Sequence, residues 1–348
     1  MTAPVSRCPA RLQFLGTLVW ILKAAVLAVL CVQPLLAQIG QDEVHFLPPS
    51  RPARLAEHQA TLKTNVDLVL VHVTVTDSKD RIVSNLQAGD FSVLDGKHPQ
   101  NIRYLSSEDA PISIAVIFDA SGSMRNKLDQ ARDAAIEFFR YSNPQDEFAV
   151  VTFADTPRLL AGFSDSVPDI ESVLHPIQAD GETALWDAVY LGLGEMRKAR
   201  FSKKALLVIS DGGDNHSRST EAEIKSALRE ADVQLYAIDI FERYPKTPEE
   251  RSGLLFLDEV TSLTGGRVFL THDSNELHRA VRQISDALRT QYVLGYLPGQ
   301  SARNGKWHKI KVELKHPNPR KLRAYAKKGY YGSFDRYPPP LPPAEAVK

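Results

Sequence analysis

Residues 112–123 of this 348-residue chain read Ile-Ser-Ile-Ala-Val-Ile-Phe-Asp-Ala-Ser-Gly-Ser. The part that ends at Phe118 is a short apolar run, which is typical of a strand buried on both faces of a sheet. Asp119, Ser121 and Ser123 follow where that strand ends. Residues 130–141 then place Ala and Phe at helical spacing. The order strand, polar loop and helix predicts the first unit of an α/β domain.

The same alternation continues to about residue 290. Short apolar runs predict further strands, and amphipathic stretches predict helices between them. The predicted strands are 148–153, 205–209, 233–238 and 267–270, and the predicted helices are 184–198, 221–231, 254–263 and 275–288. Buried strands joined by helices of this length indicate right-handed crossovers on a mostly parallel sheet. We therefore predict a doubly wound α/β domain over residues 110–290.

Both flanks of this domain have β character. Before it, residues 66–76 form a β-branched run, and Asp95-Gly96 separates two extended segments in the manner of a hairpin turn. After it, the predicted strands are 292–296, 310–314 and 322–325. Because isolated hairpins are marginal in water, we expect the two β segments, 61–109 and 291–334, to pair with each other or pack on the α/β domain. Residues 335–348 form a Pro-rich tail.

The N-terminal segment, residues 1–37, has the pattern of an export signal. Arg7 and Arg11 precede an apolar stretch, and Ala37 marks a plausible cleavage point before a polar, Pro-containing linker at 38–60. The alternative is a retained membrane anchor, because residues 12–32 are long enough to span a bilayer if Lys23 is tolerated. We expect a periplasmic or secreted protein, with membrane contact only through this segment if it is not cleaved.

Composition excludes several classes of function. The chain has 42 Lys and Arg against 42 Asp and Glu, and removing residues 1–37 leaves a formal charge of −3, which argues against a nucleic-acid binder. Both cysteines, Cys8 and Cys31, lie in the N-terminal segment. A cleaved protein would therefore contain no disulfide, thiolate metal site or cysteine nucleophile.

Oxygen ligands gather at the predicted carboxyl ends of the strands. Besides Asp119, Ser121 and Ser123, the chain offers Thr183 before a helix and Asp211 directly after the strand 205–209. Ligands of open doubly wound sheets bind outside the carboxyl ends of the strands, where the strand order reverses. If the strands that carry Asp119 and Asp211 are neighbours, carboxylates and hydroxyls meet there, a set that favours Mg²⁺ or Mn²⁺ over Zn²⁺ or copper.

The order Asp119-x-Ser121-x-Ser123, Thr183, Asp211 resembles the metal ion-dependent adhesion site of the von Willebrand factor type A domain. The flanks also resemble those of exported bacterial proteins with such domains. The resemblance implies that Ser121 and Ser123 bind the ion directly, and that Thr183 binds it directly or through water. It implies that Asp119 and Asp211 act directly or through bound water. An Asp or Glu of a protein partner would then complete the metal shell.

Other interpretations stay open at this stage. A metal-assisted hydrolase could use Asp119 and Asp211, although the chain lacks a Gly-x-Ser-x-Gly elbow, a phosphate-binding loop and His-Glu-x-x-His. A structural assembly component with a fixed occupant of the metal is the second alternative. Asp214, Asn215 and His216 are expected at the rim as solvated loop residues. Core-like helical spacing predicts packing roles for Phe138, Phe139, Trp186 and Tyr190.

Overall fold

The central sheet of the computed structural model has the strand order β10-β9-β8-β5-β6-β7. The structure describes residues 68–107, 109–240, 247–299, 302, 304–315 and 321–332. The strands are β5 (Ser113–Asp119), β6 (Glu147–Phe153), β7 (Pro157–Ser164), β8 (Lys204–Ser210), β9 (Gln234–Ile240) and β10 (Val268–Thr271). All neighbours pair in parallel except β6 and β7. The predicted doubly wound, mostly parallel sheet is confirmed.

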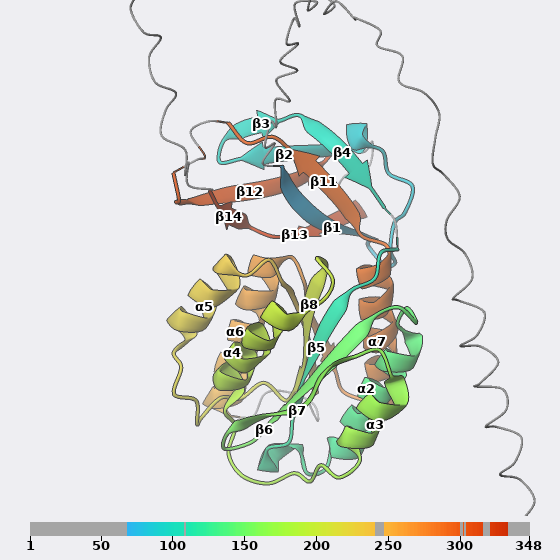
Figure 1. Ribbon diagram of the computed structural model, residues 1–348, viewed down its shortest axis with the longest axis vertical. Coiled ribbons are helices and arrows are strands. Elements are labelled where there is room, and N and C mark those ends of the chain that lie inside the picture. Colours follow the sequence, from blue (N-terminus) through green and yellow to red (C-terminus); the bar gives the residue numbers. More distant parts are fainter. Residues whose placement is uncertain are drawn as a thin grey trace, which may run out of the picture. The chain divides into compact units, whose positions relative to one another are not determined.

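Helices cover both faces of this sheet (Figure 1). One face packs against α2 (Leu128–Tyr141), α3 (Val167–Leu174) and α7 (Ser274–Arg289), and the other against α4 (Leu185–Glu195), α5 (Glu221–Glu230) and α6 (Pro248–Thr264). Adjacent residues of β5 serve opposite faces, since Val116 joins the first apolar cluster and Ile117 the second. This two-residue period explains why the strand sequence is apolar throughout.

The two flanking β segments pair with each other, as expected. One sheet has the order β13-β1-β11-β4 and the other β14-β12-β2-β3. Their strands are β1 (Val69–Asp77), β2 (Phe91–Asp95), β3 (His98–Gln100), β4 (Ile102–Ser106), β11 (Tyr292–Tyr296), β12 (Trp307–Leu314), β13 (Leu322–Ala326) and β14 (Gly329–Tyr331). The pairs β1–β11 and β2–β12 each join a strand from before the α/β domain to one from after it. We call these two sheets the β unit.

A shared core holds the two sheets of the β unit together. Phe91 of one sheet packs on Tyr292 of the other, with ring centroids 5.1 Å apart. The buried carboxylate of Asp95 accepts hydrogen bonds from the hydroxyls of Tyr296 and Tyr330. Both contacts join strands that are distant in the sequence, so neither half of the β unit has this core by itself.

Some local expectations were wrong. The strand β7 and the helix α3 were not predicted, because β7 is a half-exposed edge strand without strict alternation and α3 is short. Tyr190 was expected in the core but is 57% exposed, because the buried face of α4 centres on Leu185, Ala188 and Val189. Trp186, Phe138 and Phe139 are buried as predicted.

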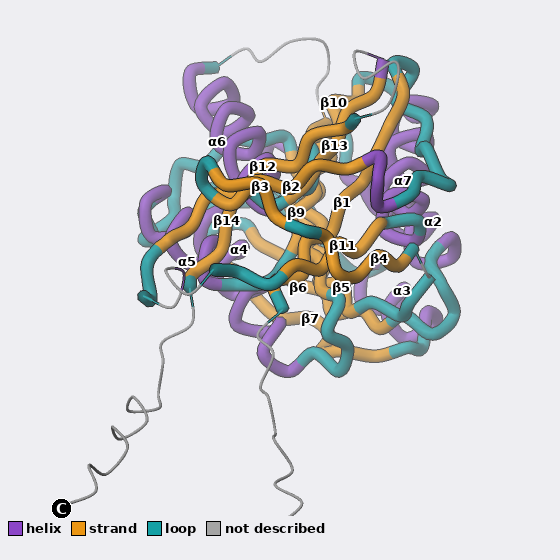
Figure 2. Tube along the Cα trace, turned by 90° about the horizontal axis from the view of Figure 1, so that it is seen from above, coloured by secondary structure: helices purple, strands orange, loops and turns teal. Residues whose placement is uncertain are grey.

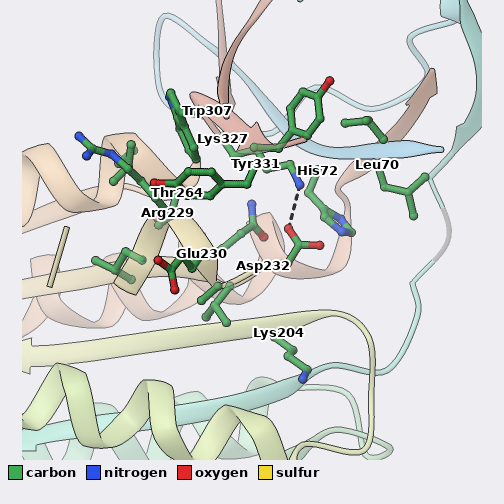
Figure 3. Close-up of a pocket in the computed structure, with 18 of the residues that line it drawn as sticks. Leu70, His72, Lys204, Arg229, Glu230, Asp232, Thr264, Trp307, Lys327 and Tyr331 are labelled. Atoms are coloured by element: carbon green, nitrogen blue, oxygen red, sulfur yellow. Dashed lines mark hydrogen bonds and ion pairs between the residues drawn. The ribbon is translucent and has the colours of Figure 1, made fainter. Parts of the chain in front are cut away.

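The β unit adjoins the α/β domain at the amino ends of β8 and β9. Figure 2 looks down on the β unit and shows α4, α5 and α6 on one side and α2, α3 and α7 on the other. Lys327 of the β13–β14 turn forms an ion pair with Asp232, with 2.8 Å between Nζ and Oδ1. The Lys328 amide donates to the Leu263 carbonyl at the end of α6. Between these contacts lies a cavity of about 630 Å³, which we call the base cleft (Figure 3).

Among the described residues, none of the helices is long and apolar enough to cross a membrane. The predicted export signal or anchor at 1–37, the linker at 38–60 and the tail at 335–348 lie outside the described residues.

Candidate metal centre

Asp119 and Asp211 come together because β5 and β8 are neighbours. Their register pairs Phe118 with Ile209, so that Asp119 and Ser210 end the two strands side by side. The next strands along the chain leave in opposite directions, β6 on one side of β5 and β8 on the other. The site is therefore at the point where the strand order reverses, as the sequence predicted.

The Asp119 carboxylate is fully buried and holds the two loops in place. Its Oδ1 accepts a hydrogen bond from the Ser121 amide at 2.8 Å, and its Oδ2 accepts one from the Ser210 hydroxyl at 2.6 Å. Burial, reinforced by the negative charge of Asp211, raises the pKa of Asp119 to about 7. Two carboxylates so close in a buried site favour the presence of a cation.

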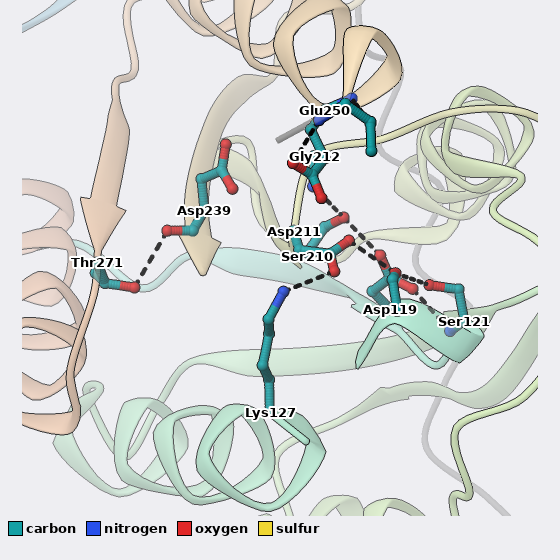
Figure 4. Close-up of polar contacts among 11 residues, drawn as sticks. Asp119, Ser121, Lys127, Ser210, Asp211, Gly212, Asp239, Glu250 and Thr271 are labelled. Carbon is teal, nitrogen blue, oxygen red and sulfur yellow. Dashed lines mark hydrogen bonds and ion pairs between the residues drawn. The ribbon is translucent and has the colours of Figure 1, made fainter. Parts of the chain in front are cut away.

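Hydroxyl groups connect the two loops on the outer side of Asp119 (Figure 4). The hydroxyl oxygens of Ser121 and Ser123 are 3.0 Å apart. The Ser123 hydroxyl donates to Oδ1 of Asp211, also at 3.0 Å. Ser121 is buried and Ser123 is exposed, so the group reaches from the interior to solvent.

Thr183 reaches this region through backbone contacts between loops. The Gly122 amide donates to the Gly181 carbonyl, and the Asp180 amide to the Ala120 carbonyl. These bonds place the loop that carries Thr183 against the loop that carries Ser121. The structure therefore brings Asp119, Ser121, Ser123 and Asp211 into contact and sets Thr183, which is 6% exposed, in the adjacent loop.

The residues expected at the rim have a supporting role. Oδ1 of Asn215 accepts the Thr183 amide, and Oδ1 of Asp214 accepts the Trp186 amide. The His216 amide donates to the Thr183 carbonyl. This segment therefore holds the start of α4 and the position of Thr183.

Sequence reasoning missed two charged residues at the site. Lys127 lies directly before α2, and its Nζ is 2.9 Å from Oδ2 of Asp211. Asp239 lies in register with Ser210, on the neighbouring strand β9. Lys127 resembles a solvated residue in the sequence, and the predicted strand ended at Ile238. A signal for Asp239 was present, because an acid there follows an apolar strand in the same way as Asp119 does.

Asp239 is a buried carboxylate without a hydrogen-bond partner. Its side chain is 0% exposed, and neither oxygen has a partner among the described residues. Burial and the charge of Asp211 raise its pKa to about 8, while the ammonium of Lys127 opposes this shift. Among the residues that the structure describes, the site therefore contains three buried carboxylates and one ammonium group.

Glycines allow α6 to pack directly on the metal-site loop. Gly212 has φ +88°, and a Cβ there would lie 3.0 Å from Oδ2 of Asp239. A Cβ on Gly253 of α6 would lie 1.2 Å from the Gly212 carbonyl oxygen. The backbone of the loop after Asp211 thus rests on α6 with no space between them.

The oxygen donors suit a hard divalent cation. Within the described ranges, no three His, Cys, Asp or Glu side chains gather in a way that could hold a metal, so a metal here would depend on the hydroxyls. Two carboxylates with serine and threonine hydroxyls are ligands that Mg²⁺ accepts, because it commonly keeps several waters. The donor chemistry therefore fits the ion that the sequence predicted.

A hollow of about 470 Å³ lies beside the site. Asp155, Arg158 and Asp180 are among the residues that line it. At its edge, Nη2 of Arg125 lies 3.6 Å from Oδ1 of Asp180, and these side chains are 69% and 91% exposed. The surface next to the site therefore presents one cation, that of Arg125, in a weak ion pair.

Comparison with known protein families agrees with this fold and these loops. Residues 114–213 match the family model of the von Willebrand factor type A domain. The match begins in β5 and ends just after Asp211. Residues 114–213 are therefore similar to a von Willebrand factor type A domain, within a mixed α/β architecture that adds the antiparallel β unit.

Several solved structures are matched at low sequence identity. A von Willebrand factor type A protein from Catenulispora acidiphila is 17% identical, with a TM-score of 0.45, over 78% of this chain and 64% of that one. The PilB minor pilin from Streptococcus sanguinis is 12% identical, with a TM-score of 0.43, over 53% of this chain and 62% of that one. The vWF domain of the type V pili tip protein Mfa5 from Porphyromonas gingivalis is 10% identical, with a TM-score of 0.42, over 51% of this chain and 95% of that one.

Because their TM-scores are below 0.5, these similarities carry no argument about the function of this chain. The chain spans less than two thirds of the length of the pilin and of the Catenulispora protein. A comparison with curated proteins finds no match.

Proposed function

We propose that the protein is an exported, non-enzymatic binding protein whose type A domain holds Mg²⁺ or Mn²⁺ and captures an acidic group of a protein partner. The observation that carries this proposal is the joining of Asp119, Ser121, Ser123 and Asp211 at the reversal of strand order. These residues come from two loops and meet at a solvent-facing edge. Such a constellation suits a ligand that arrives from outside.

Some of these residues would bind the metal ion, and Asp119 positions the loops that carry them. Ser121, Ser123, Thr183 and Asp211 would hold the ion, while Asp119 fixes the loops through the Ser121 amide and the Ser210 hydroxyl. The bound ion would supply an open coordination position for a carboxylate oxygen of the partner. Because Ser123 is exposed, that position lies within reach of a partner surface.

The rim supports recognition of an acidic group. Arg125 lies close behind Ser123 in the sequence, and its pair with Asp180 is long and exposed. Such surface pairs contribute little free energy, so a partner carboxylate can replace Asp180. The hollow lined by Arg158 offers space for side chains next to that carboxylate. Specificity would therefore come from the loops around the ion.

The hydroxyl contacts do not favour a serine hydrolase. A nucleophilic serine needs a base within hydrogen-bond distance, usually histidine, which a third group orients. Among the described residues, the Ser121 hydroxyl contacts the Ser123 hydroxyl, which donates to Asp211, and neither of these contacts involves a histidine. These oxygen atoms are arranged as ligands for a cation. We therefore propose that the site binds a metal ion and a partner and does not catalyse a reaction.

The test combines metal binding with partner capture. Mn²⁺ binding to the full chain is measured first, and proteins from a native envelope extract are then captured with Mg²⁺ or with chelator. Asp119→Ala should lose both metal binding and capture, because the loops lose their common anchor. Asp133→Ala removes an exposed carboxylate of α2 and should change neither. Capture that survives both chelator and Asp119→Ala would refute the proposed mechanism.

A further inference from the structure

Lys127 is an unusual residue at its position. It is the N-cap of α2, where its side chain makes no capping hydrogen bond, although Ser, Thr, Asp and Asn are the residues that favour this position. A positive charge at a helix N-terminus is also opposed by the helix dipole. Its side chain is nevertheless only 14% exposed. Because the side chain does not cap the helix, its contacts elsewhere are the feature to explain.

The ammonium group occupies one side of the Asp211 carboxylate. Nζ of Lys127 donates to Oδ2 of Asp211 at 2.9 Å, and the Ser123 hydroxyl donates to Oδ1 at 3.0 Å. Both oxygens of Asp211 therefore have protein partners. A divalent cation that uses Asp211 competes with Lys127 for the same negative charge.

A second acceptor for the ammonium lies on the next strand. Asp239 lies on β9, and Asp211 directly follows the neighbouring strand β8. Figure 4 shows Lys127 extending from the start of α2 toward this edge of the sheet. Asp239 is fully buried, and neither of its oxygens has a hydrogen-bond partner among the described residues. An unpaired buried carboxylate is costly, and a flexible lysine chain can change its partner without backbone movement.

We propose that Lys127 is an exchangeable internal cation of this site: it pairs with Asp211 in the metal-free protein and transfers to Asp239 when a divalent cation binds. In the metal-bound state, the exchange gives Asp211 the metal ion and Asp239 the ammonium group as its partner. It also makes Lys127 a competitor that sets the metal concentration at which the site fills. This inference rests on the proposed function, because it requires that the site binds a metal.

The experiment is a double-mutant cycle on metal affinity in the full chain. Lys127→Met keeps the length of the side chain and removes the charge, and Asp239→Asn keeps the shape and removes the acceptor charge. Mn²⁺ affinity is measured by electron paramagnetic resonance of the free ion, and the melting temperature is measured in chelator. Lys97→Met, at an exposed turn of the β unit, controls for the change in net charge.

Lys127→Met should bind Mn²⁺ roughly tenfold more tightly, which is an ordinary coupling between two competing ligands. The same variant should melt at a lower temperature without metal, because Asp211 loses its partner. Asp239→Asn should weaken Mn²⁺ binding when Lys127 is present and leave it unchanged in the Lys127→Met background. Such non-additivity is the signature of an exchange between the two residues.

Other outcomes overturn the exchange. Unchanged or weaker Mn²⁺ binding by Lys127→Met would show that the lysine does not compete with the metal. Equal weakening by Asp239→Asn in both backgrounds would show that Asp239 acts independently of Lys127. A wild-type chain that binds no Mn²⁺ would refute the proposed function itself. Mn²⁺ binding by Lys127→Met alone would then identify the lysine as a permanent substitute for the metal, which also contradicts the exchange.

Discussion

The two ends of the α/β domain use buried charge in opposite ways. At the carboxyl ends of the strands, the described residues include three buried carboxylates, those of Asp119, Asp211 and Asp239, and one ammonium group, that of Lys127. At the amino ends, around the base cleft, the charged groups Lys327 and Lys203 each have a partner, and we call this the matched end. Lys327 pairs with Asp232, and the buried ammonium of Lys203 donates to the Leu288 carbonyl.

This difference distinguishes a binding site from the contact between the β unit and the α/β domain. Charged groups that already have partners hold the β unit to the α/β domain. They would therefore gain little free energy from binding a ligand. Unmatched carboxylates at a solvent-facing edge gain free energy from any cation that they can coordinate. The size of a cavity is a poor guide to this distinction, because the larger cavity lies at the matched end.

The largest effect is expected where α6 packs on the metal-site loop. Gly253→Ala places a Cβ against the Gly212 carbonyl and should lower the free energy of unfolding by about 3 kcal/mol or more, as measured by urea denaturation. The matched control is Gly194→Ala in α4, where nothing lies within 4 Å of the new Cβ. That variant should gain roughly 0.5–1 kcal/mol from helix propensity. Similar results for both variants would contradict the close packing of α6 on the loop.

Metal addition should stabilise the folded protein through the site at the carboxyl ends of the strands. At a Mg²⁺ concentration about 100 times the dissociation constant, the free energy of unfolding should rise by about 2.7 kcal/mol. Asp211→Asn should remove this gain in thermal denaturation, while Asp133→Asn on the exposed side of α2 should retain it. Stabilisation by Mg²⁺ that persists in Asp211→Asn would place the ion elsewhere.

Acid should lower the free energy of unfolding through His72 of β1, which lies at the base cleft. Burial lowers the pKa of His72 to about 4, with Lys203 and Lys327 acting in the same direction and Asp232 opposing them. Because the unfolded chain binds this proton near pH 6.5 and the folded chain near pH 4, stability is complete above pH 6.5 and falls on acidification through this window. Between about pH 7.5 and pH 5 the loss should be roughly 2 kcal/mol.

The contribution of His72 is obtained by difference, because other groups also titrate in this range. Urea denaturation of His72→Gln at both pH values should show a smaller loss than the wild-type chain by roughly that amount. Equal losses in the two proteins would mean that the base cleft does not keep this imidazole neutral.

The smallest effect is expected for a single ion pair of the joint. Lys327→Met removes the partner of Asp232, whose side chain is 68% exposed, and should lower the free energy of unfolding by about 0.5 kcal/mol. Mn²⁺ affinity should stay unchanged, because the substitution lies at the opposite end of the strands. Lys97→Met serves as the charge control. An altered Mn²⁺ affinity in Lys327→Met would show that the two ends are coupled.

Much of the fold was predictable from local patterns. The apolar run before Asp119 indicated a strand buried on both faces, and the succession of strands and helices indicated a doubly wound sheet. The edge strand β7 and the exposed Tyr190 were not predictable in this way, because half-buried strands lack a clear period and a helical spacing does not say which face the sheet covers. The structure settled both points through packing.

The residues of the candidate site also fall into those that the sequence could predict and those that it could not. Asp119, Ser121, Ser123, Thr183 and Asp211 could be selected from the sequence because each lies in a loop expected at a strand or helix end. Lys127 could not, because its importance depends on a side chain that reaches across from α2. Asp239 follows an apolar run as Asp119 does, but only the register that places β9 beside β8 brings it to the site. Contacts between strands that are distant in the sequence do not produce a periodic pattern in it.

By itself, the sequence determined the class of fold, the chemistry of the oxygen ligands and the edge of the sheet where they gather. These follow from backbone periodicity and from the types of residue at the ends of strands. Only the tertiary structure decided that the two flanking β segments form one unit and that a single lysine lies among three buried acids. Strand order and register bring those groups together, and the balance of their charges exists only once they are in place.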